Sequence, residues 1–488
     1  MPAKLVAIGD SLTQGFVSGS VHRTEFSFPA MIAESLSVDE FRSPDFSGEG
    51  GLPINLEKLL RLLVERYGSK LGWADGISAA LSVRSLLDRV EDYWERGEGS
   101  LPSATGPLHH NLAAFSFLLG DCDKITEAIC RRAIPEPKDD FVNQVPESAM
   151  YRAARRTLNP SFAPEYGNLS QLEAAKVLAQ QEGGIDNLIF WLGANNCLST
   201  VTNLKIHWST PEDLELLPHK REEQKSQTNL WQPEHFQKVL ERIVPKILEI
   251  GAKNVFIATI PHVTIPPISR GITPGKQGDA ALSHDGYYEC YTHFWIWDDE
   301  FSRPDKSYPH LTRDDARTID STIDSYNQLL REEAQKQGWH IVDICTMLDN
   351  LAFRRQKGKV PYQFPAGLVE GIRKNTQTQN RLTHQDQLLL DTRFIHLAPN
   401  APEPEGKFQG GLFSLDGFHP TTIGYGLVAH EFLQVMSKVV SSKPLNWQEI
   451  IAADTLLTQP PANLENLQNT LGFLYHRTPL RQLIERLG

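Results

Sequence analysis

The chain has 488 residues, enough for one large domain or for two to three ordinary ones. Hydrophobic residues make up 40% and charged residues 22%, a composition typical of globular proteins and not of disordered ones. Lysine and arginine number 48 against 60 acidic residues, and the resulting charge of −12 argues against general binding to nucleic-acid phosphates. No apolar run approaches the roughly 18–20 residues that span a bilayer, so we expect no transmembrane segment.

The N-terminal residues and the cysteines bear on localisation. The apolar segment Leu5–Ile8 is too short for the core of a signal peptide. The five cysteines are scattered, odd in number and contain no Cys-x-x-Cys pair; they are Cys122, Cys130, Cys197, Cys290 and Cys345. This pattern argues against a disulfide framework and against a zinc cluster, so we expect a reducing, cytoplasmic compartment and no metal.

Short apolar runs alternate with helical patterns along the chain. Five runs have the continuous apolar character of strands buried on both faces of a parallel sheet: Lys4–Gly9, Leu112–Phe117, Asn187–Leu192, Val255–Thr259 and Trp339–Asp343. Leucines recur at helical spacing in Leu56–Tyr67, and a further apolar helical face runs from Phe236 to Ile247. The alternation predicts an α/β fold, a three-layer α/β/α sandwich around a roughly five-stranded parallel sheet.

The connections between these elements are longer than such a fold needs. They cover residues 68–108, 120–168, 200–233, 265–312 and 355–412, and loops of this length are usually functional or carry small elements of their own. We interpret them as insertions on a single catalytic domain, residues 1–442. Leucines at helical spacing after Ser442 predict a helical C-terminal extension, residues 443–488, packed on the core.

A Gly-Asp-Ser-Leu sequence, Gly9–Leu12, follows the first predicted strand. A serine here lies at the carboxyl end of a parallel sheet, where α/β folds bind their ligands. The segment after it can begin a helix, whose amide groups favour a developing negative charge. The alternative is that Asp10 or Ser11 only caps that helix.

The second candidate patch is Asp416–Pro420, which precedes an apolar helical stretch. An aspartate three residues before a histidine can accept a hydrogen bond from one ring nitrogen. This contact fixes the tautomer and leaves the other nitrogen as a base. The alternative is an Asp-Gly turn with a surface histidine, and the presence of Ser11 favours the catalytic interpretation.

The third patch, Gly193–Asn196, follows the strand predicted at Asn187–Leu192. A glycine turn followed by an asparagine amide at the carboxyl edge of a sheet suits an oxyanion donor. The alternative is an ordinary glycine-asparagine turn.

Together the three patches resemble the GDSL, or SGNH, family of serine esterases, lipases and acylhydrolases, which has a flavodoxin-like fold. The resemblance implies that Ser11 is the nucleophile, His419 the base and Asp416 the residue that orients it. It also implies an oxyanion hole formed by Asn195, the Ser11 amide and a residue of a further block. The best counterpart of that block, Asn111–Ser116, has Ser116 where the family has glycine. Asn196 likewise replaces an aspartate, which we expect to alter a supporting hydrogen bond only.

The substrate implied by the resemblance is a small-molecule or lipid ester, hydrolysed without a cofactor, while the oligomeric state stays open. Gly193 and His262 are candidates for the substrate-binding rim, although His262 also fits a buried or solvated loop histidine. Six aromatic residues between Tyr287 and Trp297 fit packing better than an acyl pocket, and both interpretations stay open. Two rival functions remain: a carbohydrate O-acetylesterase of the same fold, and a binding protein that has lost turnover.

Overall fold

Four parallel strands form the central sheet, in the order β1 (Val6–Gly9), β5 (Asn187–Trp191), β6 (Asn254–Ala258) and β10 (His340–Val342). The computed structural model describes residues 4–69, 76–103, 106–137, 145–215, 228–274, 282–296, 301–302, 308–352, 362–383, 385–398 and 407–464. Ile8 lies opposite Phe190, and Phe190 lies opposite Ile257. All four strands fall within runs predicted as strands, to within one residue at β6, and the α/β class is confirmed.

The predicted fifth strand, Leu112–Phe117, does not form as a strand. Its start is held beside β1 by a single parallel bridge between Asn111 and Ala7, and Leu112 N donates to Ala7 O at 2.9 Å. The segment stays beside β1 as far as Ala114, whose N–H donates to Gly9 O at 3.2 Å, and the left-handed backbone of Ser116 follows. With this bridge counted, the order of segments follows the flavodoxin-like pattern 2-1-3-4-5, whose switch point lies at β1.

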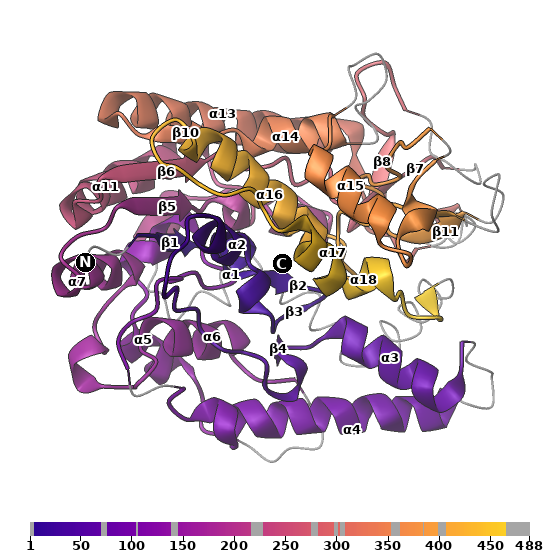
Figure 1. Ribbon diagram of the computed structural model, residues 1–488, viewed down its shortest axis with the longest axis horizontal. Helices are drawn as coiled ribbons and strands as arrows, with labels where there is room; N and C mark the ends of the chain where they lie inside the picture. Colours follow the sequence, from indigo (N-terminus) through magenta and orange to yellow (C-terminus); the bar gives the residue numbers. More distant parts are fainter. Residues whose placement is uncertain are drawn as a thin grey trace.

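Helices cover both faces of the sheet (Figure 1). Alternate strand residues point to opposite faces, so Ile8 and Ile257 belong to one hydrophobic core while Ala7 and Phe256 belong to the other. The first core is closed by α7 (Gln171–Gln181), α11 (Pro233–Ile250) and α13 (Arg313–Gln337). The second core is closed by α2 (Phe28–Ser35) and α16 (Thr422–Met436), which pack against each other. These two layers and the sheet form the expected three-layer sandwich.

Further elements lie within or next to the long connections. The helices are α3 (Leu56–Tyr67), α4 (Gly76–Glu95), α5 (Glu127–Ala133), α6 (Ala149–Leu158), α8 (Ser199–Asn203), α9 (Pro211–Glu215), α14 (Ile344–Leu351) and α15 (Ala366–Lys374). Three small antiparallel sheets join β2 (Phe16–Val17), β3 (Ser20–Val21) and β4 (Leu52–Pro53); β7 (Ser269–Ile272), β8 (Cys290–His293) and β9 (Leu311–Thr312); and β11 (His396–Ala398) and β12 (Lys407–Gln409). The assignment of residues 1–442 to a single catalytic domain with insertions stays a prediction.

The predicted C-terminal extension is described only as far as residue 464. It begins with α17 (Trp447–Ala453) and α18 (Thr455–Thr458), and α17 packs against α16. The leucines at 467 and 471, on which the helical prediction partly rested, lie outside the described residues. Within the part of the chain that is described, no helix has both the length and the apolar character required to cross a membrane.

Candidate active site

Ser11 is the first residue of α1 (Ser11–Gln14), directly after β1. The capping residue is Asp10, whose Oδ1 accepts from Leu12 N at 3.0 Å. Gly9 permits the sharp change from strand to helix, because a Cβ there would lie 2.1 Å from Thr13 Oγ1 and 2.8 Å from the Trp191 carbonyl. Ser11 therefore lies at the carboxyl end of the sheet, and the preceding residue, Asp10, caps its helix.

Asp416 and His419 lie in a buried turn between β12 and α16. The His419 Nδ1 is 3.0 Å from Asp416 Oδ2, while Asp416 Oδ1 accepts from the backbone N–H groups of His419 and Phe418 at 2.9 and 3.1 Å. Gly417 has a φ of +80°, and a Cβ on it would lie 3.0 Å from Ile268 N. Since a carboxylate only accepts, Nδ1 carries the proton and Nε2 is left as the basic nitrogen.

The N-terminal part of the chain also holds Asp416. The Gly19 N–H, in the turn between β2 and β3, donates to Asp416 Oδ2 at 2.8 Å. Burial raises the pKa of the Asp416 carboxyl, but the charge and hydrogen bond of His419, together with the two backbone N–H groups, outweigh burial and leave the pKa below its ordinary value. Asp416 is therefore an ionised acceptor at neutral pH.

Asn195 lies in the short 3₁₀ turn Ala194–Asn196, after β5. Its Nδ2 donates to the Phe117 carbonyl at 2.9 Å and to Asp10 Oδ2 at 3.4 Å. Gly193 has a φ of +123°, and a Cβ on it would lie 2.5 Å from Ile260 Cδ1, so this glycine shapes the turn. The contact of Gly193 with substrate stays a prediction.

Asn196 supports the same region from the other side. Its Oδ1 accepts from Leu119 N at 2.9 Å. The asparagine thus makes a buried hydrogen bond to the backbone.

Both sequence neighbours of Ser116, Phe115 and Phe117, form hydrogen bonds with residues of the candidate site. The Phe115 N–H donates to Gln14 Oε1 at 2.9 Å, and the Phe117 carbonyl accepts from Asn195. Ser116 has a φ of +64°, in the left-handed region that favours glycine. The backbone here has a conformation that glycine adopts more readily than serine does. The place of its amide in an oxyanion hole stays a prediction.

One pocket is lined by Ser11, Asn195 and His419 together. The imidazole of His419 packs against two aromatic rings, with its centroid 4.4 Å from that of Phe16 and 4.3 Å from that of Phe418. Most of the remaining lining is apolar: Leu12, Trp191, Leu198, Ile344, Met347, Leu348, Leu351, Leu412, Phe413, Leu427 and Val428. The residues found separately in the sequence thus meet at one apolar cavity.

The aromatic run between Tyr287 and Trp297 packs within the protein. Trp295 is buried and stacks on His293 with ring centroids 4.3 Å apart, and Tyr288 makes an edge contact with Tyr291. Neither Tyr288 nor Trp295 lines the pocket described above. Trp297 lies outside the described residues. The pocket wall comes instead from α14 and α16, a contribution that sequence reasoning missed.

Asp10 directly precedes Ser11, and its carboxylate accepts a hydrogen bond from Asn195 Nδ2. Burial raises the pKa of Asp10 to about 7, against the lowering effect of the hydrogen bond from the Leu12 amide.

His262 lines the pocket but turns both ring nitrogens to carboxylates. Its Nδ1 is 2.9 Å from Asp349 Oδ1, and its Nε2 is 3.1 Å from Asp324 Oδ1. Burial lowers the pKa of His262, but the hydrogen bonds to Asp324 and Asp349 raise it to about 12. Sequence reasoning placed His262 near the site and missed its partners, for which only the four-residue spacing of Cys345 and Asp349 on one helix gave a signal.

A family model of the GDSL-like lipases and acylhydrolases matches residues 5–432 of the chain. The chain belongs to this family. It is therefore a hydrolase of the lipase or acylhydrolase type, as the resemblance implied. A search of curated proteins found no match.

Proposed function

We propose that this GDSL-family hydrolase cleaves carboxylic esters through an acyl-enzyme on Ser11. His419 Nε2 takes the proton of Ser11 Oγ as the oxygen attacks the ester carbonyl, and Asp416 holds the imidazole through Nδ1. The protonated His419 then donates to the leaving alcohol. A water molecule, deprotonated by His419, releases the acid and restores Ser11.

The negative oxygen of the tetrahedral intermediate needs donors at the sheet edge. We assign this role to the Ser11 amide, the Ser116 amide and the Asn195 side chain. Both hydrogens of Asn195 Nδ2 already have acceptors, and the longer contact, 3.4 Å to Asp10 Oδ2, is the one that the substrate oxygen would replace.

The pocket favours an aliphatic acyl chain over a sugar. Leucine, methionine and phenylalanine side chains dominate its wall, and sugar hydroxyls would lose hydrogen bonds to water there without gaining partners. We therefore assign the pocket to the acyl group and place the alcohol toward the opening.

The observation that carries this proposal is the Asp416–His419 contact at 3.0 Å, with His419 and Ser11 lining one apolar pocket. The test is hydrolysis of nitrophenyl esters from acetyl to palmitoyl. The wild type should turn over esters, and Ser11→Ala should fall to background while staying folded. His419→Ala, and the double variant with Ser11→Ala, should be no worse than Ser11→Ala alone, because the residues act as one unit.

A matched control is Ser437→Ala, which changes an exposed serine at the end of α16 and should keep full activity. A fluorophosphonate should label the wild type and Ser437→Ala but not Ser11→Ala, since only an activated serine reacts. Unchanged turnover in folded Ser11→Ala would refute the proposal, and an unlabelled wild type would indicate a binding protein.

A further inference from the structure

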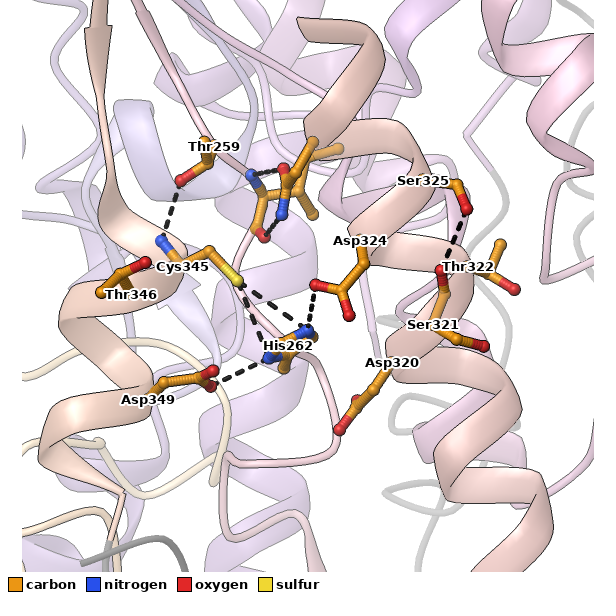
Figure 2. A network of polar contacts seen from close by, with 12 residues as sticks. Thr259, His262, Asp320, Ser321, Thr322, Asp324, Ser325, Cys345, Thr346 and Asp349 are labelled. Carbon is orange, nitrogen blue, oxygen red and sulfur yellow. Dashed lines mark hydrogen bonds and ion pairs between the residues drawn. The ribbon is translucent and has the colours of Figure 1, made fainter. Parts of the chain in front are cut away.

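Four side chains from three separate elements converge beside the pocket wall (Figure 2). His262 follows β6, Asp324 lies on α13, and both Cys345 and Asp349 lie on α14. Figure 2 shows His262 between the two helices, with the Cys345 sulfur beside its ring. The esterase mechanism uses none of these groups.

The spacing of three of these atoms suits a tetrahedral cation. His262 Nε2 is 3.1 Å from Asp324 Oδ1, and Cys345 Sγ lies 3.9 Å from Nε2 and 3.7 Å from Nδ1, with the three ligand atoms within 4.8 Å of one another. Bonds of zinc to nitrogen, oxygen and sulfur place such atoms about 3.4–3.6 Å apart at the corners of a tetrahedron. Small side-chain shifts would suffice to reach those distances.

The surroundings of His262 also fit a metal ligand. Histidine ligands commonly donate their second ring N–H to a carboxylate, which fixes the tautomer and the ring orientation. Asp349 Oδ1 lies 2.9 Å from His262 Nδ1 and can play this part. Asp349 would therefore orient the ligand without touching the cation.

The donor set indicates which cation would bind. A thiolate, an imidazole and a carboxylate favour zinc and similar transition metals over magnesium or calcium, which prefer oxygen ligands. The Asp324 side chain is 67% exposed while His262 and Cys345 are buried, so the proposed site opens to solvent on the Asp324 side, where a water molecule would take the fourth position.

We propose that His262 Nε2, Asp324 and Cys345 bind one divalent cation of the zinc type, with Asp349 orienting His262. Binding would displace the protons of the Cys345 thiol and of His262 Nε2, with no change of oxidation state. The cation has no part in ester hydrolysis, so the inference does not rest on the proposed function. It departs from the sequence-based expectation of no metal.

Such a cation would cross-link two segments that form the pocket wall. Pro261, His262 and Val263 line the pocket from one side, and Met347 and Leu348 of α14 line it beside them. One cation on His262 and Cys345 would join these two segments to each other and, through Asp324, to α13.

The test is a cobalt titration of the full chain after removal of metals with a chelator. The wild type should bind one equivalent of Co²⁺ and show thiolate-to-cobalt charge-transfer absorption, and Zn²⁺ should displace the cobalt. Cys345→Ser should abolish this absorption, whereas Cys290→Ser, which changes a cysteine of β8 outside the cluster, should retain it. Zn²⁺ should raise the melting temperature of the wild type and of Cys290→Ser only.

A second variant keeps the proposal testable if Cys345→Ser fails to fold. Asp324→Asn changes an exposed side chain and should weaken Co²⁺ binding by on the order of tenfold or more, while Asp314→Asn, also exposed on α13, should bind like the wild type. A wild type that binds no stoichiometric cobalt would overturn the proposal, leaving His262 as an imidazolium between two carboxylates. Binding that survives both Cys345→Ser and Asp324→Asn would overturn it equally.

Discussion

Ser116 combines a serine side chain with a backbone conformation that favours glycine. A Cβ in the left-handed region costs roughly 1–2 kcal/mol, part of which glycine loses again through the greater freedom of the unfolded chain. We expect Ser116→Gly to raise the free energy of unfolding by up to about 1 kcal/mol and to keep ester hydrolysis, because the backbone amide is unchanged. Urea unfolding and the ester assay measure the two effects.

The matched control for this prediction is Ser116→Ala. It removes the hydroxyl but keeps the Cβ, so it cannot relieve the strain at a φ of +64°. Equal stabilities of the glycine and alanine variants would contradict the argument from conformation.

Asn195 is the side chain on which the assigned oxyanion hole most depends. Asn195→Ala should lower kcat by about 10²–10³-fold, with a smaller effect on KM, because the donor acts mainly on the transition state. Steady-state kinetics on one ester measure the effect, and thermal unfolding checks the lost bond to the Phe117 carbonyl. A loss confined to KM would mean that Asn195 contacts the ground state.

At the scale of elements, the sequence predicts the strands and helices whose formation depends on a local residue pattern. Continuous apolar runs identified β1, β5, β6 and β10, because strands buried on both faces need no polar side. The run at Leu112–Phe117 has a similar apolar character but forms only a bridge to β1, because the Leu112 carbonyl accepts from the Gln171 side chain at 2.7 Å and the backbone turns to the left-handed region at Ser116. Those are three-dimensional causes that apolar composition does not record.

Neutral His109 connects the segment before Asn111 to α6. Its Nδ1 lies 3.1 Å from the Thr157 carbonyl, and burial lowers its pKa to about 4 despite that hydrogen bond. Above about pH 6.5, His109 is unprotonated in both the folded and the unfolded chain. As the pH falls from about 6.5 to about 4, only the unfolded chain becomes protonated, so the stability that His109 contributes is lost over this range.

His109→Asn keeps an N–H donor and removes the titrating group. We expect its destabilising effect to be largest near pH 7 and to shrink by up to about 3 kcal/mol toward pH 4, at about 1.4 kcal/mol for each unit of pKa. Urea unfolding of both proteins at several pH values measures this difference. A difference independent of pH would show that His109 titrates alike in the folded and unfolded states.

At the scale of the molecule, the motif residues were predictable and the pocket wall was not. Ser11, Asp416 and His419 occur in short sequence motifs that indicate a catalytic role. The order of the strands explains why the two motifs lie at the same edge of the sheet. The pocket wall combines residues of α14, which ends at Leu351, and α16, which begins at Thr422, and a single sequence does not reveal that the two line one pocket. The same holds for the His262 cluster, whose members share no motif.

The wall should set the acyl chain length. Leu348→Phe adds volume to the pocket from α14, so we expect kcat/KM on a palmitoyl ester to fall tenfold or more, with an acetyl ester changed less than about threefold. Leu248→Phe, on the exposed face of α11, is the matched control and should leave the profile unchanged. Equal losses on all chain lengths would point to overpacking of the core instead.

The hydrogen bond from Gly19 to Asp416 joins positions 397 residues apart and has a consequence for biosynthesis. The last strand of the sheet ends at Val342, so a growing chain can complete its sheet on the ribosome before Asp416 and His419 are translated. Any nascent chain that ends before His419 carries the proposed nucleophile, Ser11, without its proposed base. We therefore expect ribosome-bound intermediates to fold their sheet in an inert form, so that synthesis itself delays hydrolysis until the histidine emerges.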